Sequence, residues 1–588
     1  MDIDINSMNN QVARNQFKED GLASRSTEDE SSALYSPCSD GGDADSVSLS
    51  PGTFDDAPLL KMFQQSMLLL DHNSRVAGDP FHDLRGNFFS KRGWKPSLPT
   101  SMDLTSILRS IEMYWSLWPT LFKGSDQFHF EDVSSAKQFI LDSLDSKKPV
   151  VSVKALLWLS LCIQQLPKKF ESQHESLPAS PEALLDEYIS ASVSILSSDA
   201  LAGTIDGLQC FMLLSKLYLN MGKPRGAWLV SRRALDFAIL LGLHHVDENA
   251  EKERTYIWAH LWLGERQLSS ILGVPSAVVD TMVGVSEQYD KLPVEARLAY
   301  ILGIIDGRLI DRDQNCEAVE YSVTMQIDQQ LEQCRKVTFS DWWDYSPDPS
   351  TPLGTLYGRQ VIKMHFYLTR KQLHLPYMLK ASFGENHEYS RNITLDSSRE
   401  IIRCFQALRD ASGPKVIICD LLDFQAFSAA LVLVINLLLN SLTSSFDQVT
   451  RDWKLVIDTT QTLKSIAETL SCKVAAQATQ LLEYLTSLND CTYSGPEEYE
   501  AVIPYFGKVR ISQPRKEPGL NHSDFGAVSE IGNPPCFGNR VEFSTNSFTR
   551  YPPSDYLSES ELGVDWASTF TMAEDYDWTQ VFEDFASK

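Results

Sequence analysis

The sequence lacks the cysteine spacing on which small zinc-binding modules depend. Its 588 residues contain ten cysteines, and the two closest, Cys404 and Cys419, are 15 positions apart. Zinc clusters, zinc fingers and dithiol redox pairs need cysteines only a few positions apart, so none of these sites is expected here. Scattered thiols are instead typical of proteins in a reducing compartment such as the nucleus or cytosol.

Short motifs that carry chemistry are also missing: the sequence has no GxxxxGK, GxGxxG, GxSxG or HExxH. His244 and His245 are adjacent, but neighbouring helical residues point about 100° apart, so a structural role at a helix end is favoured over a metal pair. Glu265 and Arg266 lie in an apolar helix, where an ion pair to a neighbouring helix is expected. We predict no enzyme activity, no catalytic residue, no metal site and no cofactor.

Basic charge and long apolar runs are both scarce. The chain has 52 Lys and Arg against 78 Asp and Glu, a net charge of −26. Because DNA binding relies on clustered Lys and Arg, this balance argues against direct DNA binding. The most apolar stretch, residues 426–439, is shorter than the roughly 20 residues that span a bilayer and predicts a buried helix. No apolar leader follows the N-terminus, so neither a secretory signal nor a membrane partner is expected.

Helical periodicity dominates what is present, and residues 208–278 organise the rest of the chain. Apolar side chains recur there at spacings of three and four, which is typical of helices with one buried face. Three helices are predicted, ending at Gly222, Gly242 and Gly273, because glycine readily adopts the left-handed conformation that closes a helix. None of the three can bury its apolar face alone, so a larger all-helical body is predicted.

Further helices are predicted on both sides of this stretch. Arg232 and Arg233, in the second of the three, are expected to face water. The predicted helical segments are 104–122, 134–145, 151–166, 181–197, 206–221, 225–241, 253–273, 293–307, 315–336, 354–382, 394–411, 420–440, 450–470 and 472–490.

Both ends of the chain are acidic. Residues 1–56 contain twelve Asp and Glu against three basic residues, with few aromatics, which predicts disorder. Residues 555–588 contain nine acids and one base, Lys588, and alternate acids with aromatics, as disordered activation segments do. The aromatic spacing suits a short helix that enters an apolar groove on a coactivator, although the tail folding back onto the body is the alternative. The predicted contacts are Trp566, Phe570, Tyr576, Trp578, Phe582 and Phe585.

Along the chain come Trp228, the run Leu240-Leu241-Gly242-Leu243-His244, then Trp258, Glu265-Arg266 and Gly273 with Pro275. Their order and spacing resemble the regulatory middle region of fungal zinc-cluster (Zn2Cys6) transcription factors. The family has a Trp, an Ala-rich helix closing in Leu-Gly-Leu-His, a basic run, a Trp, Asp-Arg and Gly-Arg-Pro, then a later Leu-His-x-Pro. Here the basic run keeps only Arg254, Glu265 replaces Asp, and Val274 separates the Gly and Pro. The matching residues, expected to be structural, are Trp228, Leu241, Gly242, His244, Arg254, Trp258, Glu265, Arg266, Gly273, Pro275, His374 and Pro376.

The resemblance implies an all-α fold, a large multi-helix superhelical regulatory domain with disordered acidic N- and C-terminal tails. The expected organisation is a disordered acidic segment (1–56), a linker with a short amphipathic helix (57–104), the fungal transcription factor-like helical domain (105–490), a flexible linker (491–554) and an acidic-aromatic activation segment (555–588).

The resemblance also implies a function. We expect a nuclear transcription regulator or coregulator of pathway-specific metabolic genes, acting through protein contacts and the acidic tail. Its expected partners are transcription coactivators and a DNA-binding zinc-cluster protein, or a second copy of itself. Two alternatives stay open: a zinc-cluster transcription factor whose N-terminal DNA-binding domain is missing from this chain, and a helical scaffold outside transcription. The target genes, the sign of regulation and a small effector are also open.

Overall fold

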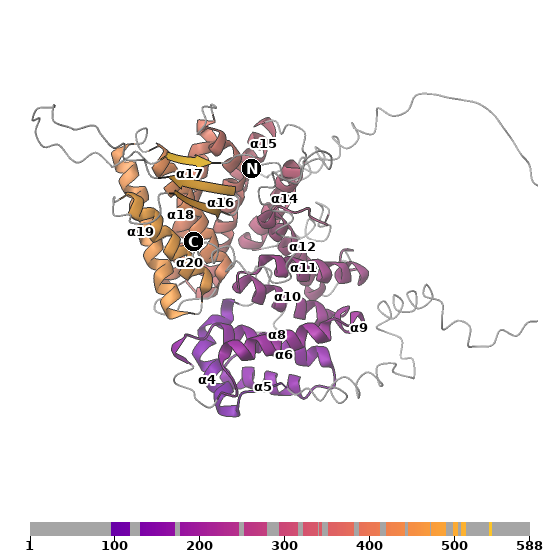
Figure 1. Cartoon of the computed structure of the whole chain (residues 1–588). Coiled ribbons are helices and arrows are strands. Elements are labelled where there is room, and N and C mark those ends of the chain that lie inside the picture. Colours follow the sequence, from indigo (N-terminus) through magenta and orange to yellow (C-terminus); the bar gives the residue numbers. More distant parts are fainter. Residues whose placement is uncertain are drawn as a thin grey trace, which may run out of the picture. The chain divides into compact units, whose positions relative to one another are not determined.

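The structure, a computed structural model, is mainly α-helical, which confirms the predicted fold class. The acidic segment 1–56, the amphipathic helix predicted at 58–70 and the tail 555–588 lie outside the described residues, and those predictions remain predictions. The structure describes residues 96–117, 130–170, 177–245, 252–278, 293–314, 321–338, 340–343, 351–381, 387–411, 419–440, 445–470, 472–489, 498–503, 507–512 and 540–543 (Figure 1).

The first group of helices surrounds α6. Helix α6 packs against α4, α5, α8, α9 and α10, and α6 and α8 lie side by side in Figure 1. Nearly every residue of α6 is buried, because this helix is apolar on all sides rather than along one stripe. The group comprises α4 (Ser101–Ile111), the 3-10 helix η2 (Glu112–Leu117), α5 (Val133–Leu144), α6 (Pro149–Gln164), α8 (Pro181–Leu196), α9 (Asp199–Ala202), α10 (Ile205–Asn220), α11 (Pro224–Leu240) and α12 (Lys252–Leu272).

The second group buries α18 at its centre. Helix α18 packs against α17, α19 and α20, and its residues from Phe424 to Leu437 are buried, which confirms the buried helix predicted there. The long helices α16 and α17 pack against each other. The group comprises α14 (Val294–Gln314), α15 (Tyr321–Arg335), the 3-10 helix η4 (Ser340–Trp343), α16 (Leu353–Ala381), α17 (Glu388–Ala411), α18 (Asp420–Asn440), α19 (Phe446–Thr469) and α20 (Lys473–Asn489).

The helix ends follow local chemistry. Thr204 caps α10 by accepting a hydrogen bond from the Gly207 amide, and Ser180 caps α8 in the same way before Pro181. At the other end of α11, Gly242 has φ +71°, and the next amide donates to the carbonyl of Ala238. Gly222 and Gly273 end α10 and α12 with the same backbone, so these three predicted ends are found where expected.

A small antiparallel sheet lies in the region predicted to be a flexible linker, residues 491–554. Its strands are β1 (Glu498–Ile503), β2 (Gly507–Ser512) and β3 (Arg540–Phe543), in the order β1-β2-β3. The structure differs here from the sequence prediction, which gave weight to the Pro, Gly, Ser and Asn content. Residues 507–512 alternate polar and apolar residues, the period of a strand, but over too few residues to stand out.

None of the helices that the structure describes combines the length and the apolar character needed to cross a bilayer.

Candidate functional site

Glu265 of α12 is the centre of the motif region. Its carboxylate is fully buried. Oε1 accepts hydrogen bonds from Arg232 Nη1 of α11 at 3.0 Å and from the Ala277 amide at 3.1 Å. Oε2 accepts a hydrogen bond from Ser276 Oγ at 2.7 Å. One side chain therefore ties α11, α12 and the segment after Gly273 together, and the ion pair to a neighbouring helix is the kind expected from the sequence.

Trp228 joins this centre through a serine. The Trp228 indole N–H donates to Ser269 Oγ at 2.9 Å, and Ser269 Oγ donates to Glu265 Oε1 at 3.0 Å. The Arg232 guanidinium lies 5.1 Å from the centre of the Trp228 ring. Arg232 was predicted to face water; 31% of its side chain is exposed, but its charge is paired with the buried Glu265, which the sequence did not predict.

The end of α11 packs onto the start of α12. Arg254 Nη2 donates to the carbonyl of Leu241 at 2.8 Å, near the end of α11, where cations satisfy free carbonyls. The His244 ring lies 3.8 Å from the His245 ring and 6.0 Å from that of Trp258. Burial and the neighbouring His245 lower the pKa of His244, which favours a neutral packing imidazole. No group of three or more metal-ligating side chains occurs in the described ranges.

Arg266 ties α12 to α14. Its side chain is fully buried, and it donates to the carbonyls of Gly303 at 3.1 Å and Val278 at 2.8 Å. The guanidinium lies 4.7 Å from the centre of the Trp262 ring. The residues that follow Pro275 are thus held by Glu265, at Ser276 and Ala277, and by Arg266, at Val278.

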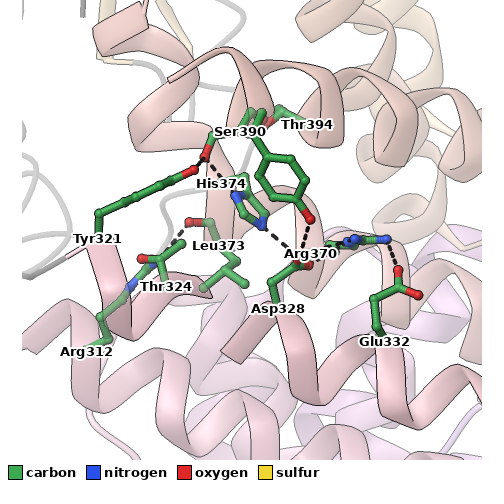
Figure 2. A network of polar contacts seen from close by, with 11 residues as sticks. Arg312, Tyr321, Thr324, Asp328, Glu332, Arg370, Leu373, His374, Ser390 and Thr394 are labelled. Atoms are coloured by element: carbon green, nitrogen blue, oxygen red, sulfur yellow. Dashed lines mark hydrogen bonds and ion pairs between the residues drawn. The ribbon is translucent and has the colours of Figure 1, made fainter. Parts of the chain in front are cut away.

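His374 and Pro376 lie in α16, and His374 belongs to a second polar network (Figure 2). Asp328 of α15 faces Arg370 and His374 there, with Arg370 Nε 2.7 Å from Asp328 Oδ1 and His374 Nε2 3.4 Å from it. Tyr389 OH donates to Asp328 Oδ2 at 2.6 Å. Burial acts to raise the pKa of Asp328, but contacts from His374, Arg370 and Tyr389 hold it well below its usual range.

The network continues on the other side of His374. Its Nδ1 lies 2.9 Å from Ser390 Oγ of α17, which also lies 2.9 Å from Tyr321 OH of α15. Burial lowers the pKa of His374. The buried imidazole of His374 therefore links α15, α16 and α17 through its two ring nitrogens.

Pro376 lies inside α16 and removes one backbone donor from that helix. Arg312 of α14 donates to the carbonyl of Leu373 at 2.8 Å, one turn before the proline, and to Thr324 Oγ1 at 3.2 Å (Figure 2). The carbonyl that loses its helical donor is that of Gln372, four residues before the proline, and Arg312 bonds the carbonyl next to it.

The structure brings together the predicted motif residues from Trp228 to Pro275 and places His374 in a separate network, with Pro376 two residues further along α16. Asp328 and Arg370 were not among the site residues predicted from the sequence. Two acids, Asp328 and Glu332, are four residues apart on α15, and Arg370 and His374 are four residues apart on α16. This matched spacing of acids on one helix and basic side chains on the next was the available sequence signal for the network. Both clusters hold helices in place, and their buried charged groups form ion pairs or hydrogen bonds. The aromatic residues of the tail lie outside the described residues.

The region that carries these motifs matches a known protein family, and most of the chain matches known proteins. Residues 111–303 match the fungal specific transcription factor domain, which confirms the resemblance seen in the motifs. The chain is 25% identical over 500 residues to a dehydrocurvularin biosynthesis regulator of Aspergillus terreus, covering 76% of this chain and 66% of that protein. It is 25% identical over 470 residues to the regulator of the same name from Alternaria cinerariae, covering 70% and 60%.

A third relative is transcription factor sdnS of Sordaria araneosa, 26% identical over 399 residues, covering 62% of this chain and 51% of that protein. The matches thus span between about half and just under two thirds of the length of these relatives.

Proposed function

Residues 111–303 match the fungal specific transcription factor domain, and on that premise we propose that the protein regulates the transcription of pathway-specific metabolic genes. The family match is the observation that carries the proposal. The names of the relatives support it, because two are called biosynthesis regulators and one a transcription factor.

The proposed mechanism works through protein contacts in the nucleus. The helical body presents a rigid platform, held at its motif region by Glu265 and Arg266. The acidic tail recruits coactivators, because its carboxylates keep the aromatic side chains in water until they enter an apolar groove. With a net charge of −26 and no cysteine cluster, the chain reaches DNA through a partner that carries a zinc cluster. A second copy of the chain is the other proposed partner.

A tethering assay tests the activation step. Residues 550–588 are fused to an unrelated DNA-binding domain, and reporter output is measured. We expect strong activation that falls at least tenfold when the aromatic residues are replaced by alanine. The replaced residues are Trp566, Phe570, Trp578, Phe582 and Phe585.

A matched control replaces five hydroxyl residues of the same tail by alanine and is expected to keep the output. A silent intact tail, or equal loss in the two variants, contradicts an acidic-aromatic activator. The control positions are Ser558, Ser560, Ser568, Thr569 and Thr571.

A second candidate is a zinc-cluster transcription factor whose cysteine cluster is encoded upstream of this chain. The coverage of the relatives favours keeping it, because between a third and a half of each relative lies outside the match. Mapping of the transcript start distinguishes the two, since an in-frame upstream exon with six clustered cysteines is expected only for this candidate. Tight, selective binding of a promoter duplex by the purified chain alone also contradicts a separate DNA-binding partner.

The remaining alternative, a helical scaffold outside transcription, predicts unchanged transcript levels when the gene is deleted. Our proposal predicts that deletion changes the transcripts of a set of metabolic genes, as RNA sequencing measures.

A further inference from the structure

Helix α11 exposes more large apolar residues than any other helix in the described part of the chain. They are Leu229, Ile239 and Leu240, which are 56%, 39% and 55% exposed. The opposite side of the helix, which includes Ala227 and Ala234, is buried where α11 packs on α10 and α12 (Figure 1). Apolar residues gathered on one exposed helix face typically mark a surface that binds another molecule.

The two leucines end a stripe along the exposed side of α11. The stripe consists of Leu229, Arg233, Asp236 and Leu240, at spacings of four, three and four residues. Because each helical residue turns by 100°, these four side chains leave the helix within about 60° of one another. Alternating spacings of three and four are those of the contact line between two helices packed side by side.

The stripe keeps the same spacing when it is read from its other end. A second α11 that runs antiparallel to the first, about a two-fold axis at the middle of the stripe, therefore aligns with it position by position. Leu229 then faces Leu240 of the second copy. Arg233 likewise faces Asp236 of the second copy. Each end of such a contact pairs two leucines, and its centre holds two ion pairs between opposite charges.

Both central charges of the stripe are available at the surface. Asp236 is exposed and makes no polar contact within the described ranges. The side chain of Arg233 is 40% exposed and bonds Asp199 at 3.0 Å and the Ser197 carbonyl at 3.2 Å, but Asp199 is itself 81% exposed. Exposed pairs of this kind contribute little, so Arg233 can turn to a carboxylate of a second copy without a large loss.

These charges favour a second copy over the acidic tail as the partner of the stripe. Residues 555–588 contain nine acids and one base, so they attract Arg233 but repel Asp236. A second copy meets both charges with opposite ones. It also presents its own two leucines at the matching separation, since the same stripe lies on both helices.

We propose that two copies of the chain associate through this stripe, with the two α11 helices antiparallel about its midpoint. Such self-association deepens the proposed function and rests on it, because a second copy is one of the partners named there. Helix α11 has 17 residues and is about 25 Å long, so one pair of these helices makes a contact below the roughly 1,200 Å² of stable complexes. The dimer is therefore expected to be weak, with a dissociation constant of roughly 1–100 µM.

Exchange of the two central charges tests the surface on the purified full chain. Sedimentation velocity from about 1 to 200 µM separates the monomer, 66.2 kDa, from the dimer. Arg233→Glu and Asp236→Arg each set like charges against each other in a dimer, and each is expected to raise the dissociation constant at least about tenfold. In an equal mixture of the two variants, the mixed dimer has opposite charges at both central positions. Its dissociation constant is expected to return to within about threefold of the wild-type value.

Lys454→Glu and Asp458→Lys are the matched controls, because they change an exposed ion pair of α19, outside the stripe. Both are expected to leave the dissociation constant unchanged, alone and mixed. Leu240→Asn removes the apolar pair at both ends of the contact and is expected to weaken the dimer at least about tenfold. Circular dichroism checks that each variant keeps its helical content.

A photoreactive benzophenone amino acid in place of Leu240 identifies what touches the stripe. The expected product has the mass of a dimer and joins this position to a peptide that contains Leu229. A product of monomer mass that joins it to residues 555–588 overturns the proposal and makes the tail the occupant.

Three sedimentation results also overturn it: a chain that stays monomeric at the highest concentration, a dimer that Arg233→Glu leaves unchanged, or a mixture that does not recover. The readout is the mass of the purified protein and not reporter output or transcript level. A failure here is therefore distinguishable from a failure of the transcriptional role.

Discussion

Replacing Glu265 with alanine removes the acceptor that holds α11, α12 and the Gly273–Val278 segment together. Four donors lose their partner: Arg232, Ser269, Ser276 and the Ala277 amide. A buried donor left without an acceptor costs about 1–3 kcal/mol. The two hydroxyls can turn to other acceptors, and Arg232 regains water because 31% of its side chain is exposed.

We therefore expect the free energy of local opening to fall by roughly 3 kcal/mol, well below the sum over four donors. Hydrogen–deuterium exchange with mass spectrometry measures this in peptides covering α11, α12 and residues 273–278. A loss of 3 kcal/mol corresponds to exchange that is about 150-fold faster. Glu265→Gln keeps the shape and one acceptor oxygen, so its exchange is expected to lie between those of wild type and Glu265→Ala.

Asp199→Ala is the matched control for this prediction. Asp199 also accepts a hydrogen bond from an arginine of α11, Arg233, at 3.0 Å, but its side chain is 81% exposed. Exposed pairs contribute about 0–1 kcal/mol, so exchange in α11 is expected to change less than about fivefold. If Glu265→Ala and Asp199→Ala accelerate exchange equally, burial of the carboxylate does not decide its contribution and the reasoning fails.

Two further predictions use the same body. Gly303→Ala places a methyl carbon 2.5 Å from Trp262 Cζ3 and is expected to lower the free energy of unfolding by about 1–3 kcal/mol. Gly264→Ala, whose new carbon has no atom within 4 Å, is expected to raise it slightly. Thermal unfolding followed by circular dichroism compares the two variants, and a lower melting temperature for Gly264→Ala contradicts the packing argument. Burial and the nearby Lys216 lower the pKa of His260 to about 4, so the unfolded chain binds the proton more tightly than the folded one. Stability is therefore expected to fall as the pH drops from about 6.5 to 4. Urea titrations across this range should show a smaller fall for His260→Gln, and an equal fall in both proteins refutes the assignment.

Most of the helical fold was predictable because its signals are local. The spacing of apolar residues and the stops at Gly222, Gly242 and Gly273 placed the helices around α11 and α12 within a few residues. The strands were missed because a six-residue alternation carries little information beside a composition rich in turn-forming residues.

The sites were only partly predictable. The resemblance pointed to Glu265, but not to Arg232, whose position in α11 gave no sign that it would face a buried carboxylate. Lys371 lies among ordinary charged residues of α16 in the sequence, and so does Arg370 beside it. Which of two adjacent cations pairs with an acid depends on the helices that face each side of α16.

The sequence by itself determined the helical class, the helix ends, the acidic termini and the family resemblance, because each depends on neighbouring residues or on total composition. Only the tertiary structure decided which charges are paired. The partners Arg232 and Glu265 are 33 positions apart, and Asp328 and Arg370 are 42 apart. It also placed the Lys371 ammonium against Ser428 Oγ, since the packing of α16 on α18, not the order of residues, sets what a buried ammonium meets.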